Sequence, residues 1–229
     1  MSYFPICLDI RNRYCIVIGG GNVAQRKVHA LIAYGGKVTV ISPEIISELA
    51  ELQKTGKLEW IDRAYQKGDL TGAFLVIAAT DDPDVQATIS NEAEEKNILL
   101  NVADVPKWCN FILPATIRRG DLTVSFSTAG KSPALARKLR KENEERFGEE
   151  YEILLKILGE VRETVLAQGR PHEENKTLFH NLLDCDMLEW IKKRDWGAMK
   201  RHLKDSVGIE IELQNYNDDG VVKSRSTAS

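Results

Sequence analysis

The stretch Ile16–Ala24 (Ile-Val-Ile-Gly-Gly-Gly-Asn-Val-Ala) constrains the fold more than any other part of the chain, because an apolar run there passes directly into a glycine turn. Gly19 permits a tight turn out of a strand, Gly21 lets the backbone approach a phosphate without an intervening Cβ, and Ala24 allows a helix to pack closely on the strand. The start of the following helix favours an anion through its free amides and its dipole. The pattern predicts a dinucleotide pyrophosphate site, the alternative being a purely structural turn.

The segments on either side of this turn have the periodicity of a βαβ unit. Tyr14–Ile18 and Lys37–Ile41 are predicted strands, Val23–Tyr34 is a predicted helix, and Gly35 follows it as a stop signal. The unit closes within about thirty residues, as βαβ units do. This context favours nucleotide binding over a plain connection.

The chain goes on alternating between strands and helices as far as Leu113. The further predicted elements are the helices Glu44–Lys54 and Asp84–Lys96 and the strands Leu58–Ile61, Ala73–Ala79 and Ile98–Val102. Such alternation predicts an α/β fold with a Rossmann-type, doubly wound parallel sheet. Ligands of these sheets bind outside the carboxyl ends of the strands.

The pattern changes at Pro114. Thr116–Arg119 and Leu122–Ser127 predict a β-hairpin, Pro133–Phe147 predicts a charged helix, and the periodicity is helical from Glu149 onward. We therefore expect a nucleotide-binding domain over 1–113, a small α+β dimerisation unit over 114–148, a helical domain over 149–205 and a flexible tail over 206–229. Because an isolated hairpin is marginally stable in water, the middle unit is expected to pair with a second copy in a homodimer.

The composition of the 229-residue chain is that of an ordinary soluble protein, with 43% hydrophobic and 28% charged residues. Its net charge of −3 argues against general attraction to nucleic acid. No apolar run approaches the roughly twenty residues that cross a bilayer. Met1–Ile10 also lacks the basic start of a signal peptide. We expect a cytoplasmic protein that binds neither nucleic acid nor membranes.

The cysteines and histidines are too scattered to predict a metal site or a disulfide framework. They are Cys7, Cys15, Cys109 and Cys185, and His29, His172, His180 and His202. No two cysteines have CxxC spacing. We expect reduced, mostly buried thiols and no resident metal.

Several blocks of sequence, in order, carry a resemblance to a known family. They are Gly19–Lys27, Ala78–Asp82, Asn101–Lys107, Phe111–Ala115 and Ser127–Arg137. Over roughly residues 3–205 they resemble the dehydrogenase and ferrochelatase module of siroheme synthase. The resemblance implies a precorrin-2 dehydrogenase, which oxidises precorrin-2 to sirohydrochlorin with NAD, and some members also insert ferrous iron. Whether this chain binds Fe(II) transiently for that second reaction, and whether its product enters siroheme or cobalamin, stay open.

Oxidation of precorrin-2 requires a base, and Asp104 is the residue that position and resemblance both indicate. It follows a predicted strand and lies among Val102, Ala103 and Val105, where desolvation would raise the pKa of its carboxyl group. The alternative is an aspartate that only caps a turn. The same carboxylate would take pyrrole protons during metal insertion.

The expected cofactor contacts follow the carboxyl ends of the strands. They are Gly19, Gly21, Asn22 and Val23 at the pyrophosphate, Pro43 and Glu44 near the ribose, and Thr80 and Asp81 along the nucleotide. A Rossmann fold usually ends its second strand in an acid that binds the ribose, but Ser42 stands there and Glu44 follows two residues later. No arginine lies nearby to accept a 2′-phosphate, which Glu44 would repel, so NAD is favoured over NADP.

Precorrin-2 carries several carboxylates, so its site should contain cations and hydroxyl groups. The expected substrate contacts are Thr128, Lys131, Ser132 and Arg137, around the turn at Gly130 and the helix start that follows it. Further basic residues of this region are Arg118, Arg119, Lys138, Arg140 and Lys141, for which a solvated face is the alternative. For Arg26 and Lys27, packing and a phosphate contact are equally compatible with the sequence, and any regulation at Thr128 stays open.

A different class of protein, an NAD-sensing regulatory module without catalysis, also needs only the glycine turn and a dimer. It leaves the blocks Asn101–Lys107 and Thr128–Arg137 unexplained. These two blocks favour the enzyme.

Overall fold

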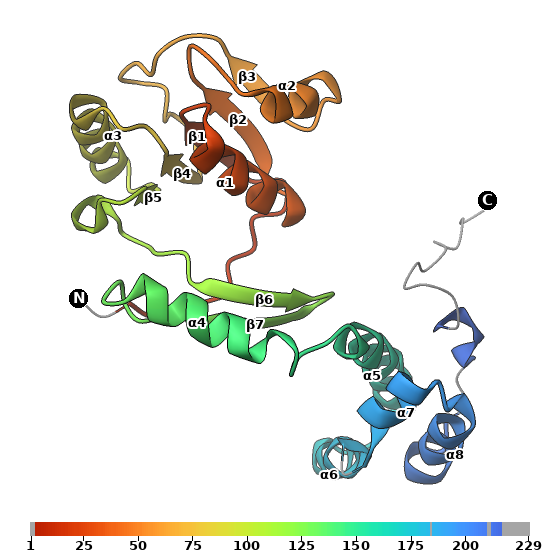
Figure 1. Cartoon of the computed structure of the whole chain (residues 1–229). Helices are drawn as coiled ribbons and strands as arrows, with labels where there is room; N and C mark the ends of the chain where they lie inside the picture. The colour runs from red at the N-terminus through yellow and green to blue at the C-terminus, as the bar shows by residue number, and fades with distance from the viewer. Residues whose placement is uncertain (1–2, 184, 210–211, 217–229) are drawn as a thin grey trace. The chain divides into compact units, whose positions relative to one another are not determined.

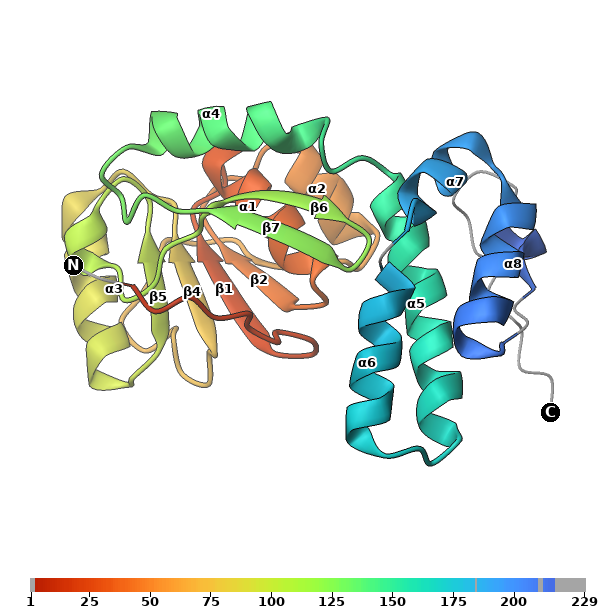
Figure 2. The same ribbon diagram turned by 90° about the horizontal axis from the view of Figure 1, so that it is seen from below.

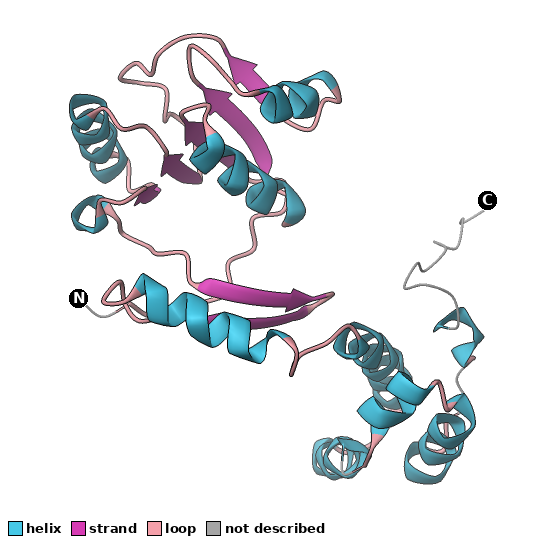
Figure 3. Cartoon of the chain, viewed as in Figure 1, coloured by secondary structure: helices cyan, strands magenta, loops and turns pink. Residues whose placement is uncertain are grey.

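The computed structural model describes residues 3–183, 185–209 and 212–216. Their contacts divide the chain into two units. The first runs through Leu113 and includes Ala129–Lys131, and the second comprises Pro114–Thr128 and the chain from Ser132 onward (Figure 1). Strands and helices alternate in the first unit, whereas helices dominate the second (Figure 3).

The first unit is built on a parallel sheet. Its strands are β1 (Tyr14–Ile18), β2 (Lys37–Ile41), β3 (Glu59–Ile61), β4 (Leu75–Ala78) and β5 (Leu99–Val102). They form one five-stranded sheet in the order β3-β2-β1-β4-β5, and Figure 2 shows β2, β1, β4 and β5 side by side in this order. Val17 lies opposite Val40 on one side and Ile77 on the other. This order and direction confirm the predicted Rossmann-type fold.

Both faces of the sheet are covered, which is why its strands are continuous apolar runs. The covering helices are α1 (Asn22–Ala33), α2 (Ser47–Lys54) and α3 (Pro83–Glu95). Val17 packs with Val28 of α1 in one buried cluster, while Ile16 and Ile18 pack with Ile89 of α3 in another. Successive strand residues alternate between the two clusters because the side-chain period of a strand is two.

The starts of α3 and α2 are set by different hydrogen bonds. The side chain of Asp82 accepts hydrogen bonds from the amides of Asp84 and Val85 at 2.9 and 3.2 Å, so α3 starts directly after it. Helix α2 starts at Ser47, later than the predicted Glu44, because the amide of Ile46 donates to the carbonyl of Gly20 at 3.0 Å. A contact distant in sequence therefore keeps this segment extended.

The second unit joins a hairpin to a helical core. Its elements are β6 (Ala115–Arg119), β7 (Leu122–Phe126), α4 (Pro133–Glu144), α5 (Glu150–Ala167), α6 (His172–Leu183), α7 (Met187–Lys193) and α8 (Trp196–Val207). Strands β6 and β7 are antiparallel, and α4 packs on both. Ile157, Val161, Met199 and Leu203 are fully buried between the helices.

The chain beyond α8 joins the same core for a few residues. Helix α8 ends at Val207, inside the segment 206–229 predicted as a flexible tail, and Leu213 of a short 3-10 helix (Leu213–Tyr216) is 1% exposed. The predicted flexible tail otherwise lies outside the described residues from position 217. Among the described residues, no helix combines the length and apolarity that spanning a bilayer requires.

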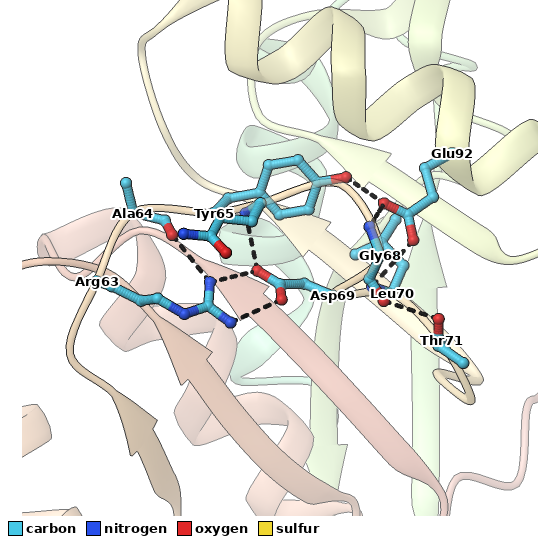
Figure 4. Close-up of polar contacts among 9 residues, drawn as sticks. Arg63, Ala64, Tyr65, Gly68, Asp69, Leu70, Thr71 and Glu92 are labelled. Carbon is cyan, nitrogen blue, oxygen red and sulfur yellow. Dashed lines mark hydrogen bonds and ion pairs between the residues drawn. The ribbon is translucent and has the colours of Figure 1, made fainter.

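A buried carboxylate organises the segment between β3 and β4 (Figure 4). Glu92 of α3 is 0% exposed and accepts hydrogen bonds from the hydroxyl of Tyr65 and from the amides of Gly68 and Leu70, the amide bonds at 2.8 and 3.2 Å. Burial and the adjacent carboxylate raise the pKa of Tyr65, which keeps its hydroxyl protonated as the donor. Lys96 adds a cation at 3.9 Å.

We expect Glu92→Gln to destabilise the protein by about 1–3 kcal/mol, because the amide group of glutamine would place a donor against a buried donor. Urea unfolding measures the effect. The matched control is Glu95→Gln on the same helix, where the replaced carboxylate is exposed and pairs only at the surface with Lys67 at 3.4 Å. That change should stay within about 0.5 kcal/mol. Equal stability of the two variants would contradict the anchoring role of Glu92.

Candidate active site

The glycine turn after β1 lies against two neighbouring strand ends. A Cβ added to Gly19, whose φ is +111°, would come within 2.4 Å of the carbonyl oxygen of Ala79, and one on Gly20 within 1.9 Å of the carbonyl oxygen of Glu44. Both positions therefore exclude any side chain. The role of Gly20 is not predicted by the dinucleotide-binding pattern, although the run of three consecutive glycines is a signal for it.

The third glycine faces open space. A Cβ on Gly21 would meet no atom within 4 Å, and Gly21 caps α1 without any side-chain hydrogen bond to the first turn. The first turn of α1 contains no acidic residue. Asn22 is exposed and Val23 is half-buried beside it. This combination of open space and uncapped helix amides fits the pyrophosphate of a dinucleotide.

The loop after β2 is anchored at its first residue and exposed at the next two. Ser42, at the position where a ribose-binding acid is usual, is buried; its carbonyl accepts a hydrogen bond from the indole of Trp60 at 2.9 Å. Pro43 and Glu44 are both exposed. Trp60 thus supports the predicted ribose contacts, and no local sequence pattern pointed to it.

The loop after β4 is supported in the same way. Gln86 of α3 is buried and its amide donates to the carbonyl of Thr80 at 2.7 Å. The amide of Ala79 donates to the carbonyl of Ile18 at 2.7 Å, which joins this loop to the end of β1. Thr80 is half-buried, and Asp81 is exposed at the sheet edge.

Asp104 follows β5 at this same edge and has an unusual backbone. Its φ is +60°, in the left-handed region that residues other than glycine adopt at a cost of about 1–3 kcal/mol. The amide of Ala103 donates to the carbonyl of Ala78 at 2.8 Å, which ties the strained position to β4. Asp104 is exposed, so the desolvation by apolar neighbours that the sequence suggested does not occur. Backbone strain at an exposed polar residue is typical of functional sites.

The segment after Asp104 folds back along the edge of β5. The side chain of Asn110 accepts from the amide of Leu100 and donates to the carbonyl of Ile98, both at 2.8 Å, in place of a neighbouring strand. The amide of Val102 lies 3.2 Å from the sulfur of Cys109, whose thiol pKa is raised by burial. These contacts fix the chain on both sides of Asp104.

Lys27 brings a cation toward this site. It is half-buried on α1. Burial and the neighbouring Arg26 lower the pKa of Lys27, while the charge of Asp104 acts to raise it. Lys27 is therefore an electrostatic neighbour of Asp104, a relation that the sequence alone did not indicate.

The predicted substrate residues surround a left-handed turn at Ala129 and Gly130, with φ of +51° and +80°. The hydroxyl of Thr128 accepts from the amide of Ser132 at 3.1 Å, and the hydroxyl of Ser132 accepts from the amide of Leu135 at 3.2 Å. Both hydroxyl groups keep their own proton for donation to a ligand.

The charges predicted for the substrate site fall into two groups. Lys131 and Arg137 are exposed. By contrast, Lys138 pairs with Glu142 at 3.6 Å and Arg140 pairs with Glu144, each one turn along α4. Lys131 belongs to the first unit, with the cofactor residues and Asp104, whereas Thr128, Ser132 and Arg137 belong to the second.

Two protein families match the chain in succession. Residues 6–115 match the family described as "Putative NAD(P)-binding", and residues 119–143 match the one described as "Sirohaem biosynthesis protein central". Among solved structures, the chain is similar to "SirC, precorrin-2 dehydrogenase" with a TM-score of 0.73 and 25% identity, over 88% of this chain and 100% of that one.

Curated relatives are larger proteins. Siroheme synthase 3 of Aeromonas hydrophila subsp. hydrophila is 37% identical over 207 residues, which are 90% of this chain and 44% of the relative. Siroheme synthase of Methylobacillus flagellatus is 41% identical over 215 residues, 94% of this chain and 46% of the relative. The chain spans about half the length of the curated relatives it matches. It belongs to the sirohaem biosynthesis family in which an NAD(P)-binding domain precedes the sirohaem central region.

Proposed function

We propose that this chain catalyses the NAD-dependent oxidation of precorrin-2 to sirohydrochlorin in siroheme or cobalamin biosynthesis. The observation that carries the proposal is one sheet edge with two features: the open glycine turn at the start of α1 and the exposed, strained Asp104 after β5. The likeness to a precorrin-2 dehydrogenase over the whole of that chain supports this substrate. A sensor without catalysis would need no strained carboxylate at this edge.

The oxidation removes a hydride and a proton from the macrocycle, and NAD, when bound, supplies the hydride acceptor. Asp104 accepts the proton as the carbon–hydrogen bond breaks. Its fixed backbone, tied to β4 through Ala103, holds the carboxylate in one place during this transfer. Lys27 of α1 brings a cation near this carboxylate, whose charge acts to raise the pKa of Lys27.

The cofactor is held by the three loops at the carboxyl edge. The amides of Asn22 and Val23 would bind the pyrophosphate, because Gly19 makes the tight turn before them and Gly21 leaves the space in front of them open. Pro43 and Glu44 would contact the ribose. Thr80 and Asp81 follow the nucleotide along the β4 loop. Because Glu44 is an exposed carboxylate, it repels the 2′-phosphate of NADP and favours NAD.

The carboxylates of precorrin-2 require cations and hydroxyl donors. Lys131 and Arg137 are exposed and can pair with substrate carboxylates. Thr128 and Ser132, on either side of the left-handed turn, retain hydroxyl protons that they can donate. The acidic partners of Lys138 and Arg140 make these two residues weaker choices.

The same carboxylate serves insertion of Fe(II), with the metal as a substrate rather than a resident cofactor. Metal insertion requires the pyrrole nitrogens to lose protons, and Asp104 is the exposed carboxylate at this edge that would accept them. Within the described residues, no three His, Cys, Asp or Glu side chains gather into a metal site.

The protein acts as a cytoplasmic homodimer in this proposal. Apolar residues of β7, Leu122, Val124 and Phe126, are only half-buried, and a two-stranded sheet is marginal alone. A second copy would bury them.

The dimer is tested by light scattering of the eluting protein over a concentration series. We expect twice the mass of one chain throughout the series, because burial of the β7 residues stabilises the pair. The mass of a single chain at every concentration would contradict the dimer.

Two adjacent glycines provide a matched test of the cofactor site. Gly20→Ala should destabilise the protein by about 1–3 kcal/mol, because its methyl group would overlap the carbonyl of Glu44. Gly21→Ala should leave stability within about 0.5 kcal/mol, since its space is open and its φ of −91° suits alanine. Its methyl group should nevertheless weaken NAD binding at least tenfold, about 1.4 kcal/mol. Calorimetric titration with NAD measures this, and unchanged affinity of Gly21→Ala would place the pyrophosphate elsewhere.

Asp104→Asn tests the base. Asparagine has nearly the same shape and tolerates a left-handed backbone, so the variant should fold and bind NAD like the parent. We expect NADH formation from precorrin-2 to fall by a factor of about 100 or more, as for loss of a general base. Near-normal turnover of this variant would refute the assignment, and absence of NADH formation by the parent protein would favour the sensor.

The parent protein and Asp104→Asn also test metal insertion separately from oxidation. Sirohydrochlorin and Fe(II), supplied without NAD, should give metallated product with the parent protein and little with Asp104→Asn. Equal metallation by both proteins would show that Asp104 does not take the pyrrole protons.

A further inference from the structure

A cysteine and a histidine lie in contact in the helical part of the second unit. Cys185 stands in the turn between α6 and α7, and His202 lies on α8. The sulfur of Cys185 is 3.1 Å from Nε2 of the imidazole. The other ring nitrogen, Nδ1, is 3.3 Å from the hydroxyl of Ser206, one turn further along α8. A nucleophile, a base and a group that orients the base therefore stand in series.

The hydrogen-bond geometry around the ring provides a path for the thiol proton to reach it. When Nδ1 carries the ring proton and donates to Ser206, Nε2 is free to accept the proton of Cys185. The carbonyl oxygen of Leu182 is 3.4 Å from the sulfur of Cys185 and 3.1 Å from Nε2, so it accepts from the thiol before this transfer and from Nε2 after it. The ring centroids of Trp190 and His202 are 5.4 Å apart, with the two rings tilted by 59°.

The other cysteines have different surroundings. Cys15 is fully buried, and burial raises the pKa of its thiol to about 11. Cys109 is half-buried, with a raised thiol pKa, and Cys7 is exposed. Among the hydrogen bonds of the described chain, a histidine contact is found for Cys185 and for none of these three. Cys185 is itself only partly buried, so a small reagent can reach it.

We propose that Cys185 is a thiol-modification site, at which His202 acts as the base and peroxides are the electrophiles. The thiol proton moves to Nε2, and the thiolate sulfur attacks one peroxide oxygen. A sulfur–oxygen bond forms as the oxygen–oxygen bond breaks, so cysteine is oxidised by two electrons to the sulfenic acid. The proton held by His202 passes to the departing hydroxide, which leaves as water. This site is independent of the proposed dehydrogenase activity.

The experiment uses the reduced full chain with hydrogen peroxide, and dimedone to trap sulfenic acid. Mass spectrometry of peptides follows Cys185 and Cys7 in the same sample, so the exposed Cys7 is an internal control. We expect Cys185 to be labelled at least about tenfold faster than Cys7, because His202 lies beside Cys185 as a base and the described chain shows no histidine contact for Cys7. Labelling of Cys185 no faster than that of Cys7 overturns the proposal, and this comparison needs no variant.

His202→Gln then tests the base, since glutamine retains a polar side chain of similar reach. Labelling of Cys185 should fall about tenfold or more, while that of Cys7 stays unchanged. Ser206→Ala should cause a smaller decrease, because it only orients the ring. Circular dichroism confirms that both variants are folded. An unchanged Cys185 rate in folded His202→Gln overturns the role of the histidine.

Discussion

The backbone of Gly19 and Gly20 lies so close to the carbonyl groups of Ala79 and Glu44 that no Cβ would fit between them. This contact holds the loops after β1, β2 and β4 together at one edge of the sheet. The amide of Ile46 donates to the carbonyl of Gly20 beside this contact, so α2 begins only at Ser47, while the next glycine, Gly21, faces open space. The cofactor site therefore depends on an interaction in which side chains take no part.

The residues that support this edge differ from those proposed to act there. Trp60 and Gln86 each donate to a backbone carbonyl, while the side chain of Asn110 accepts from the amide of Leu100 in β5 and donates to the carbonyl of Ile98 just before it. The groups with chemistry to perform, Glu44 and Asp104, are exposed. Such a division fixes the backbone of each loop and leaves the carboxylates free to meet ligands. It also explains how a strained φ at Asp104 persists, since the chain is tied on both sides of it.

Much of the first unit could be predicted because its elements obey local rules. The strands Tyr14–Ile18 and Lys37–Ile41 agree with the structure residue for residue, since apolar runs between turn signals identify buried strands. The start of α2 was misplaced, because a hydrogen bond from Ile46 to Gly20 overrides the local preference. The sequence also did not predict that Asp104 is exposed. Val102 is buried, but the left-handed backbone at Asp104 turns the chain, so that apolar neighbours in sequence do not bury its carboxylate.

The sequence by itself determined the order of strands and helices, the glycine turn, and the blocks that identify the family, because these depend on local spacing. Only the tertiary structure decided which distant groups meet. Glu92 reaches the amide of Leu70, 22 positions earlier, and Cys185 meets His202 across 17 positions. Such pairs leave no periodic signal, since the distance between them is set by how helices and sheet pack and not by the residues that separate them along the chain.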